Sequence, residues 1–467
     1  MADAAFSFRR DRTALWAVKQ ATGRAAASVI GIPEPRVVSG EGSVAQMGAV
    51  VTELGAKKPL IVTDKMLVKL GMVQPCIDSL VAAGLSYAVY DEVVPNPHTG
   101  LCEAAHAAYV SEGCDAIIAF GGGSPMDCAK VVGAMVANPK PSVRDYQGMF
   151  QVTNMGLKTM PPFVAVPTTA GTGSETTIAA IITVASERAK ITIADQGLVP
   201  RVAVLDPVIL AGLPKGVTAA TGMDALTHAV ESFLGGWTTE FTERHSLLAV
   251  EKIFAFLLRS YHAGGDMEAR GAMLQASFEA GLAFTRANVG YVHAIAHQFG
   301  GLFHTPHGVA NAMVLPWILD FYVADEAAAG DELTCTARFV EIARAAGLAS
   351  HYAELDEAAQ RALAARLVRE VRAMNAEMEL PQTVPEMTCA DVPVVATRAL
   401  KEAHGELHGG FGQSPIKHAL DLGYPVPKHL TQAGCEAIVA QFLPKAERER
   451  WVGGGGRLPP APVQSKL

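Results

Sequence analysis

The sequence predicts an α/β domain with a doubly wound, mainly parallel sheet, followed by an all-helical domain. Over the first 210 residues, short apolar and β-branched runs alternate with helical stretches. Such alternation is typical of parallel strands joined by right-handed helical crossovers. From about residue 214 to 445, long helical patterns follow one another with few strand signals. The length of 467 residues also favours two domains over a single core.

The first domain is expected to consist of short buried strands and connecting helices. Each predicted strand is an apolar run of strand length, and the strands are expected at residues 60–63, 87–90, 115–120, 163–167, 178–184 and 202–205. Helices are expected at 72–83, at 100–112 and from the glycine-rich turn at 121–124 to about 136. The domain boundary is placed near residue 210, because the pattern changes after Asp206-Pro207.

The second domain, residues 211–451, is expected to be helical throughout. Its predicted helices are 217–234, 240–262, 266–283, 292–302, 335–346 and 357–377. Residues 452–467 contain four consecutive glycines and a Pro-Pro-Ala-Pro run, which predicts a disordered tail.

The composition excludes several classes of protein. Half of the residues are apolar and 18% are charged, so the chain can bury large cores and is not intrinsically disordered. The net charge of −8 argues against a nucleic-acid partner, because phosphate binding needs a basic surface. The sequence has no run of 18 uncharged apolar residues, which argues against a membrane span.

The cysteines and the N-terminal segment indicate a cytoplasmic protein. The seven cysteines are scattered without a CxxC pair, as expected for free thiols in a reducing compartment. The first 30 residues lack the uninterrupted apolar core of a secretory signal. Residues 6–24 are rich in arginine, and a transit peptide is the alternative there to a terminal helix that packs on the body or on a partner subunit.

Histidines gather in one short stretch of the second domain. Four of the fourteen histidines lie between His293 and His307, and Asp224 and His228 stand four residues apart upstream. A spacing of four residues places two side chains on the same face of a helix, and His293 and His297 repeat it. One aspartate and three histidines, without a thiolate, suit Fe²⁺ or Zn²⁺ and can polarise a substrate oxygen. For any single histidine, the alternative is a hydrogen-bonded core or surface residue.

Two glycine-rich loops follow buried strands in the first domain. Gly121, Gly122, Gly123 and Ser124 precede a helix, whose N-terminus offers free N–H groups to a phosphate. In the first turn of that helix, Asp127 is a candidate for orienting a ribose or the loop itself. A Gly/Thr-rich loop at 167–175 follows another strand. Because ligands of such sheets bind at the carboxyl ends of the strands, the pair of loops favours a dinucleotide, with plain tight turns as the alternative.

A carboxylate closes the strand at 60–63. Asp64 can accept hydrogen bonds from an adenosine ribose and would repel a 2′-phosphate, which favours NAD over NADP. The alternative is an ordinary N-cap of a helix over 65–70.

These motifs resemble those of the iron-containing (group III) alcohol dehydrogenases, which have the dehydroquinate synthase-like fold. The similarity covers roughly residues 30–390. The matching stretches are LIVTDK (60–65), VPNP (94–97), GGGSPMDCAK (121–130), VPTTAGTGSETT (166–177), ATGMDALTHAVES (220–232) and HAIAHQFGGLFHTPHGVANAM (293–313).

The resemblance implies a role for most of the residues in these motifs. It implies a metal held by Asp224, His228, His293 and His307, with Fe²⁺ expected and Zn²⁺ as the alternative. It leaves His297 beside the substrate, where it passes a proton, and His304 in the pocket wall. The implied NAD-binding residues are Asp64, Asn96, Gly123, Ser124, Thr168, Thr169, Gly171, Thr172, Thr177 and Lys190, with the backbone near Ile209, and the glycine-rich loop adds Gly122 and Asp127.

Two regions depart from the family pattern. Residues 1–27 precede the usual start, so the predicted NAD-binding domain is 28–210. An atypical insertion occupies about 400–430, where His404 and His408 form another pair at helical spacing. That pair could bind a metal, but the flanking glycines favour a surface loop.

The predicted function is NAD-dependent interconversion of a primary alcohol and its aldehyde in a homodimer or larger homo-oligomer. The alternatives are a hydroxyacid–oxoacid transhydrogenase that retains its NAD and a lyase of the dehydroquinate synthase type. The lyase needs basic residues around a phosphate, and few lie between Asp224 and His307: Arg244, Lys252, Arg259, Arg270 and Arg286. A non-enzymatic scaffold is a further alternative, against which an intact set of four ligands counts.

Overall fold

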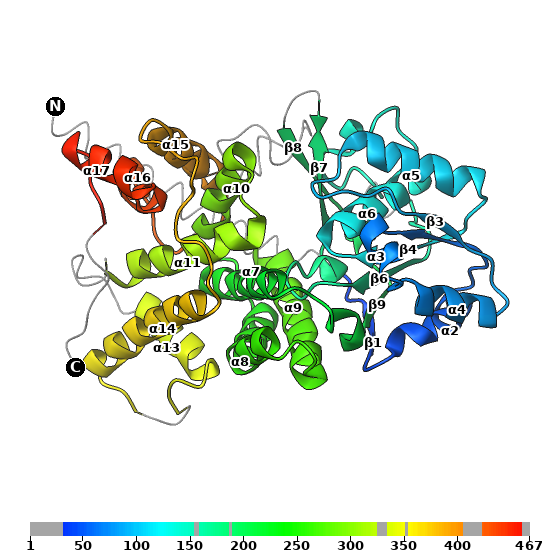
Figure 1. Cartoon of the computed structure of the whole chain (residues 1–467), viewed down its shortest axis with the longest axis horizontal. Coiled ribbons are helices and arrows are strands. Elements are labelled where there is room, and N and C mark those ends of the chain that lie inside the picture. Colours follow the sequence, from blue (N-terminus) through cyan, green and yellow to red (C-terminus); the bar gives the residue numbers. More distant parts are fainter. Residues whose placement is uncertain are drawn as a thin grey trace.

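The computed structural model describes residues 31–153, 158–185, 189–324, 334–350, 354–404 and 423–459. Figure 1 shows a sheet-containing part at one end of the molecule and a helical part at the other, with helices α7 and α9 beside the sheet. The predicted extension at 1–27 and residues 460–467 of the predicted tail lie outside the described residues.

A six-stranded sheet forms the centre of the first part. Its order is β1-β9-β6-β4-β2-β3, and every neighbouring pair is parallel. The chain runs from β2 outward to β3 and then returns to β4 on the other side of β2. The order in which strands are added therefore reverses between β2 and β4, although all strands stay parallel. This reversal is where open α/β sheets bind ligands. The strands are β1 (Arg36–Ser39), β2 (Pro59–Val62), β3 (Ala88–Tyr90), β4 (Ala116–Gly121), β6 (Phe163–Pro167) and β9 (Val202–Leu205).

Helices cover both faces of this sheet. On β4, Ile118 and Phe120 belong to the core formed with α2 and α4, whereas Ile117 and Ala119 belong to the core formed with α5 and α6. Central strands buried on both faces read as continuous apolar runs, which is why the sequence reveals them. The helices are α2 (Met47–Glu53), α3 (Lys65–Lys69), α4 (Gln74–Ala82), α5 (Thr99–Ser111) and α6 (Gly123–Ala137).

A separate three-stranded sheet lies beside the main one. It has the order β5-β8-β7, with β7 and β8 antiparallel, and comprises β5 (Gly148–Met149), β7 (Ala179–Val184) and β8 (Ala189–Ala194). The expectation that segment 178–184 joins the parallel sheet is therefore wrong. Its side chains alternate between buried and more exposed, which is the pattern of a hairpin strand covered on one face.

The second part is a set of packed helices. They are α7 (Lys215–Leu234), α8 (Glu240–His262), α9 (Met267–Ala287), α10 (Tyr291–Phe303), α11 (His307–Ala324), α13 (Thr334–Ala345), α14 (Glu357–Glu377), α15 (Asp391–Ala403), α16 (Gln432–Val439) and α17 (Lys445–Gly453). Helix α8 has its predicted bounds because Thr239 caps it, accepting a hydrogen bond from Thr242 N. Helix α11 was not predicted, because it lacks an amphipathic period and contains Pro316. The predicted tail begins at Val452, whereas α17 continues to Gly453.

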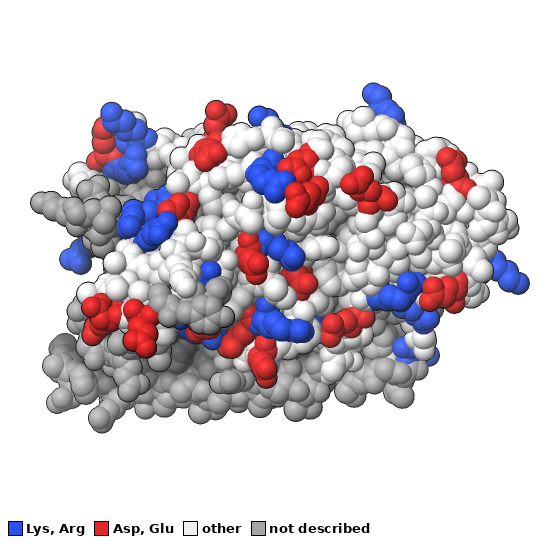
Figure 2. All heavy atoms as spheres, turned by 90° about the horizontal axis from the view of Figure 1, so that it is seen from below, with Lys and Arg blue, Asp and Glu red and all other residues white. Residues whose placement is uncertain are grey.

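The surface mixes charges of both signs. On the face in Figure 2, basic and acidic side chains lie interspersed. Among the described residues, charged side chains form ion pairs, such as Arg259 with Asp266 and Arg338 with Glu243. Within the described part of the chain, no helix combines the length and the apolar character that a membrane crossing requires.

Candidate metal and nucleotide site

The four predicted metal ligands lie together. Asp224 and His228 come from α7, His293 from α10 and His307 from the start of α11, and their ligand atoms all lie within 4.8 Å of one another. Three of the side chains are buried, and His307 lies at the rim with 42% of its side chain exposed. Among the described residues, these four form a group of side chains that could hold a metal ion.

A glycine allows α11 to approach α7 closely enough to complete this group. A Cβ atom at Gly308 would lie 2.3 Å from Ala220 O. Only glycine avoids that clash, and the resulting approach brings the His307 Nε2 atom to 3.5 Å from Asp224 Oδ1.

Hydrogen bonds fix which ring nitrogen of the buried histidines faces the cluster. His228 Nδ1 lies 3.3 Å from Gly171 O, and His293 Nδ1 lies 2.6 Å from Glu231 Oε2. In both rings Nδ1–H donates, which leaves the lone pair of Nε2 for a metal. Glu231 also accepts a hydrogen bond from Val292 N. Sequence reasoning missed this carboxylate, although it stands only three residues after His228.

The contacts of the Asn311 side-chain amide show that three of the ligand atoms converge. Asn311 Nδ2 lies 2.7 Å from Asp224 Oδ1 and 3.2 Å from both His293 Nε2 and His307 Nε2. Lone pairs that point at one position form the donor set that a divalent cation needs. One carboxylate with three imidazoles therefore fits Fe²⁺ or Zn²⁺.

Burial keeps the imidazoles of the cluster neutral. Desolvation lowers the pKa of His228 and of His307, and it lowers the pKa of His293 well below its ordinary value, with a further contribution from the neighbouring imidazoles. Burial also raises the pKa of Glu231 to about 7, against the hydrogen bonds from the backbone that lower it. Neutral rings are the form that binds metal.

His297 lies beside the cluster but outside the ligand set. Its ring is stacked on His307 with the centroids 5.4 Å apart, and its Nδ1 atom lies 2.6 Å from Glu402 Oε1. Burial lowers the pKa of His297, but the charge and hydrogen bond of Glu402 raise it by more, so the net shift is upward. His304, the predicted wall residue, is exposed and forms the C-cap of α10 in a left-handed conformation.

The two glycine-rich loops face each other at the carboxyl ends of β4 and β6. A Cβ atom at Gly122 would lie 3.3 Å from Thr169 Oγ1, and one at Gly123 would lie 3.2 Å from Thr172 Cγ2. Thr168 N donates to Gly121 O, which ties the loops together. Helix α6 begins at Gly123, so Ser124 lies in its first turn.

The loop at 167–175 also contacts the helical part. A Cβ atom at Gly171 would lie 2.7 Å from Thr221 O on α7, and one at Gly173 would lie 2.8 Å from Ser277 O on α9. Gly171 O is the partner of His228 Nδ1. The predicted nucleotide loop and the ligand cluster are therefore in direct contact.

Buried polar groups stabilise the loop at 167–175 and the residues after it by hydrogen bonds. Lys130 is fully buried, and its Nζ atom donates to Ser174 Oγ, to the carbonyl and hydroxyl of Thr177 and to Ala179 O. Burial lowers the pKa of Lys130 to about 8. Asp127 accepts hydrogen bonds from Ser174 Oγ and Ile181 N. These contacts favour the interpretation of Asp127 as the residue that orients the loop, and Lys130 is a supporting residue that sequence reasoning missed.

The remaining residues predicted to bind NAD surround these loops. Asp64 Oδ1 accepts from Leu67 N, so the side chain caps α3 at the end of β2. Lys190, on the β7–β8 hairpin, donates to Asn96 Oδ1 at 2.8 Å, and Asn96 adopts a left-handed conformation with φ 57°. Ile209 is buried in the turn after β9.

Comparison with known proteins decides the family. The family model "Iron-containing alcohol dehydrogenase" matches residues 34–207, and the model of the C-terminal part of the Fe-containing alcohol dehydrogenase family matches residues 218–408.

This chain belongs to the iron-containing alcohol dehydrogenase family. It is 34% identical over 370 residues to the NAD-dependent methanol dehydrogenase of Bacillus methanolicus, covering 79% of this chain and 92% of that one. It is 36% identical over 369 residues to a 1,3-propanediol dehydrogenase of Klebsiella pneumoniae, covering 78% and 90%. A crystal structure of a 1,3-propanediol oxidoreductase superposes with a TM-score of 0.77 at 31% identity, over 89% of this chain and 100% of that one.

These findings confirm the predicted family, fold class and enzymatic activity. The chain is an oxidoreductase of the alcohol dehydrogenase type, in a family with NAD-dependent members. Three of the five basic residues considered for the lyase alternative have partners elsewhere. Arg259 pairs with Asp266, Arg270 donates to Gly264 O and Arg286 donates to Ile32 O.

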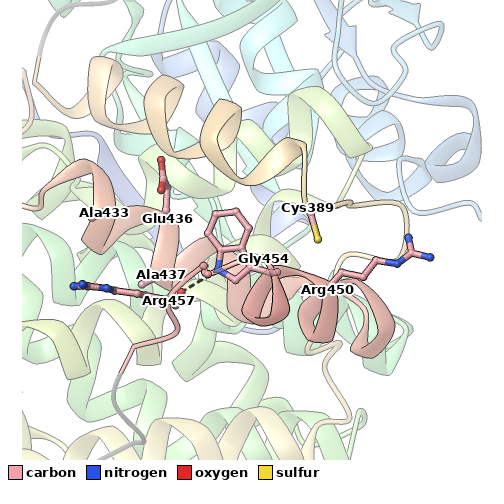
Figure 3. Close-up of a pocket in the computed structure, with 10 residues that line it drawn as sticks. Cys389, Ala433, Glu436, Ala437, Arg450, Gly454 and Arg457 are labelled. Atoms are coloured by element: carbon pink, nitrogen blue, oxygen red, sulfur yellow. Dashed lines mark hydrogen bonds between the residues drawn. The ribbon is translucent and has the colours of Figure 1, made fainter.

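A further cavity of this alcohol dehydrogenase lies apart from the ligand cluster. It measures about 440 Å³ and lies between α16, α17 and the glycine-rich turn at 454–456 (Figure 3). Burial and Glu447 raise the pKa of its thiol, Cys389, whose Sγ atom donates to Glu447 O. Trp451 Nε1 donates to Arg457 O, so the indole is also engaged within the cavity wall.

Proposed function

We propose that the chain is an NAD- and Fe²⁺-dependent dehydrogenase that interconverts a small primary alcohol and its aldehyde. The observation that carries the proposal is the hydrogen bond between His228 Nδ1 and Gly171 O. It joins a set of four converging ligands to the loop that is predicted to bind the dinucleotide. A hydride acceptor and a Lewis acid beside it are the two components of a metal-dependent alcohol oxidation.

Asp224, His228, His293 and His307 are the proposed metal ligands. When bound, the metal polarises the substrate oxygen and favours loss of its proton. Gly171 O and Glu231 keep the rings of His228 and His293 turned with Nε2 toward the cluster. Phe284 stacks on the His228 ring at 4.0 Å and shields it from water.

Fe²⁺ is proposed over Zn²⁺ from the family. Both family models describe iron-containing enzymes. The donor set has no thiolate, so it does not favour a soft ion.

NAD is proposed to lie across the carboxyl ends of β2, β4 and β6. The cofactor supplies the hydride acceptor. Gly122, Gly123 and Ser124 offer the N-terminus of α6 to its phosphates, with Thr168, Thr169, Gly171 and Thr172 on the opposite loop. Asp64 is proposed for the adenosine ribose, and the Lys190–Asn96 pair, Thr177 and Ile209 complete the site.

His297 is proposed to hold and transfer the proton that leaves the alcohol. Its Nδ1–H donates to Glu402, and the ring is 41% exposed beside His307. A ring nitrogen within reach of the substrate, with its other nitrogen engaged, is the arrangement of a general base.

The substrate is proposed to be a small uncharged alcohol. The relatives are named for methanol and 1,3-propanediol, and a 37% identical protein of Escherichia coli is named lactaldehyde reductase. The hydroxyacid–oxoacid transhydrogenase is the second candidate, and release of free NADH distinguishes the two.

The experiment uses anaerobically purified enzyme loaded with Fe²⁺. NADH formation is followed with methanol, 1,3-propanediol and 1,2-propanediol, and a Zn²⁺-loaded sample is run in parallel. The proposal expects net NADH release with at least one alcohol and higher activity with Fe²⁺. Turnover of a hydroxyacid with an oxoacid and no NADH release would contradict it.

We also propose that the protein is a cytoplasmic homo-oligomer. All seven cysteines are free and five of them are buried, which suits a reducing compartment. Light scattering of the purified protein measures the oligomeric state, and a monomer would contradict the proposal.

A further inference from the structure

A second carboxylate–histidine pair lies next to the metal ligands. Glu402, near the end of α15, reaches His297 on α10 with 2.6 Å between Oε1 and Nδ1. The Glu402 side chain is 20% exposed and the His297 side chain 41%, so water screens this pair more than it screens the buried pair of Glu231 with His293. Two histidines one turn apart on α10 therefore each have their own carboxylate.

Glu402 is held in place by further donors. Tyr424 OH donates to Oε1 at 2.7 Å, and Gln298 Nε2 donates to Oε2 at 2.8 Å. Together with His297 Nδ1, three donors converge on the two oxygens of one carboxylate. A carboxylate with so many partners has one preferred orientation.

The two residues that follow Glu402 are also anchored. Ala403 is buried, and its carbonyl accepts a hydrogen bond from Tyr424 N at 2.7 Å. The next residue, His404, accepts from or donates to Tyr291 OH through Nε2 and stacks on His429 with 4.7 Å between the ring centroids. These contacts join α15 to α10, so the position of Glu402 relative to His297 is set by the fold.

The pairing determines which form of His297 faces the substrate. Because Nδ1–H donates to Glu402, the proton of the neutral ring stays on Nδ1. The Nε2 atom on the opposite side of the ring is then left with a lone pair. A ring without this partner can rotate about its side-chain bonds and exchange its tautomers, and both changes misplace the accepting nitrogen.

We propose that Glu402 is a positioning residue of the dehydrogenase reaction. It fixes the orientation and the Nδ1-protonated tautomer of His297, and Tyr424 holds the carboxylate for this task. The inference rests on the proton-transfer role proposed above for His297.

The first test compares graded substitutions at Glu402 in the iron-loaded enzyme. Glu402→Gln keeps an oxygen that can accept from Nδ1–H, whereas Glu402→Ala removes the acceptor. We expect Glu402→Ala to lower kcat by about 10- to 100-fold and Glu402→Gln by less, since this is the usual effect of losing a partner that orients a catalytic imidazole. The KM for NAD and the iron content are expected to stay within about twofold of wild type.

A matched control comes from a histidine–carboxylate pair remote from the cluster. Glu377 Oε1 lies 2.7 Å from His262 Nε2, and both side chains are about half exposed. We expect Glu377→Ala to leave kcat unchanged. Equal losses in Glu402→Gln and Glu402→Ala together with lost iron would assign Glu402 a purely structural role and overturn the proposal.

A double-mutant cycle separates this inference from the role of His297 itself. If His297→Ala leaves kcat unchanged, the proposed role of His297 is wrong. If His297→Ala slows turnover but Glu402→Ala does not, only the positioning role of Glu402 is wrong. The proposal expects that Glu402→Ala has almost no further effect in the His297→Ala background, because the two residues act as one unit.

A structural readout does not depend on activity. In crystals of the metal-free protein, the His297 ring is expected to have one orientation in wild type and in Glu377→Ala. In Glu402→Ala it is expected to rotate or to occupy more than one rotamer. An unchanged single orientation in Glu402→Ala would overturn the proposal.

Discussion

The two sides of the proposed site, called here the sheet wall and the helical wall, present different kinds of chemical group. The sheet wall, formed by the loops at 121–124 and 167–177, presents glycine backbone and threonine hydroxyls. The helical wall, formed by α7, α10 and α11, presents a carboxylate and imidazoles. Each wall is supported by buried charged residues: Lys130 and Asp127 contact the loop at 167–177, and Glu231 contacts His293. We infer from this comparison that the groups on the walls select the ligand, while the buried charges behind them keep those groups in position.

Substitution in the front of the helical wall is expected to have the largest effect. His293→Ala removes one of four metal ligands and leaves Glu231 buried without its ring partner. We expect metal affinity to fall by more than about 100-fold and activity to be lost. Metal content is measured by elemental analysis, with the exposed His262→Ala as the control. A His293→Ala enzyme that keeps its metal would contradict the assigned ligand set.

A substitution behind the sheet wall, Lys130→Met, is expected to weaken NAD binding without changing metal binding. Lys130→Met removes four hydrogen bonds and a cation that interacts with both Asp127 and Glu175. We expect the free energy of unfolding to fall by about 3–5 kcal/mol and the Kd for NAD to rise, while metal affinity stays within about twofold. Urea unfolding and calorimetric titration measure these quantities.

The surface Lys58→Met is the control for Lys130→Met. Lys58 pairs with Glu112, and its loss should cost less than about 1 kcal/mol. If Lys130→Met weakened metal binding and NAD binding equally, it would contradict the assignment of NAD binding to the sheet wall and of metal binding to the helical wall.

The contact between α7 and α11 within the helical wall can be tested with a pair of glycines. A Cβ atom at Gly308 would lie 2.3 Å from Ala220 O, so Gly308→Ala pushes α11 away from α7. We expect a loss of about 1–3 kcal/mol in stability and weaker metal binding. In α10, a Cβ atom at Gly301 meets no atom within 4 Å, so Gly301→Ala is expected to be neutral or stabilising. Thermal unfolding with and without metal distinguishes the two variants, and equal behaviour would contradict the role given to Gly308.

The smallest expected effect is a pH dependence from behind the sheet wall. Glu175 is buried, burial raises its pKa to about 7, and among the described residues Oε1 has no hydrogen-bond partner. The unfolded chain loses this proton near pH 4.5, the ordinary value, whereas the folded protein keeps it until about pH 7. The stability that Glu175 contributes is therefore present in full below the unfolded pKa and is lost as pH rises to about 7.

We expect Glu175→Gln to flatten the fall in stability between pH 5 and pH 7, by on the order of 2 kcal/mol. The measurement is urea unfolding of the metal-free protein across this range. Parallel pH profiles of wild type and variant would assign the dependence to another group.

Short-range patterns in the sequence point to the candidate residues of each wall. Asp224 with His228 and the loop at 121–124 are each contained within a few residues of chain. The supporting groups are harder to predict, since their partners are distant in sequence. Glu231 lies 62 residues from His293, and Glu402 lies 105 residues from His297. No periodicity or spacing rule connects positions that far apart.

In the fold as well, elements encoded by nearby residues are predicted from the sequence, whereas elements that depend on tertiary packing are not. Helices α8 and α14 have the predicted bounds because Thr239 and Asp356 cap them. Helix α11 and the pairing of β7 with β8 depend on tertiary packing, and neither was predicted. The hairpin brings Lys190 within hydrogen-bond distance of Asn96.

The most direct test of the proposed site is anomalous diffraction at the iron edge from crystals of anaerobically purified enzyme. The account predicts one strong peak at about 2.0–2.2 Å from donor atoms of Asp224, His228, His293 and His307, with His297 outside the coordination sphere. A peak coordinated by His297, or iron bound away from these four residues, would contradict it.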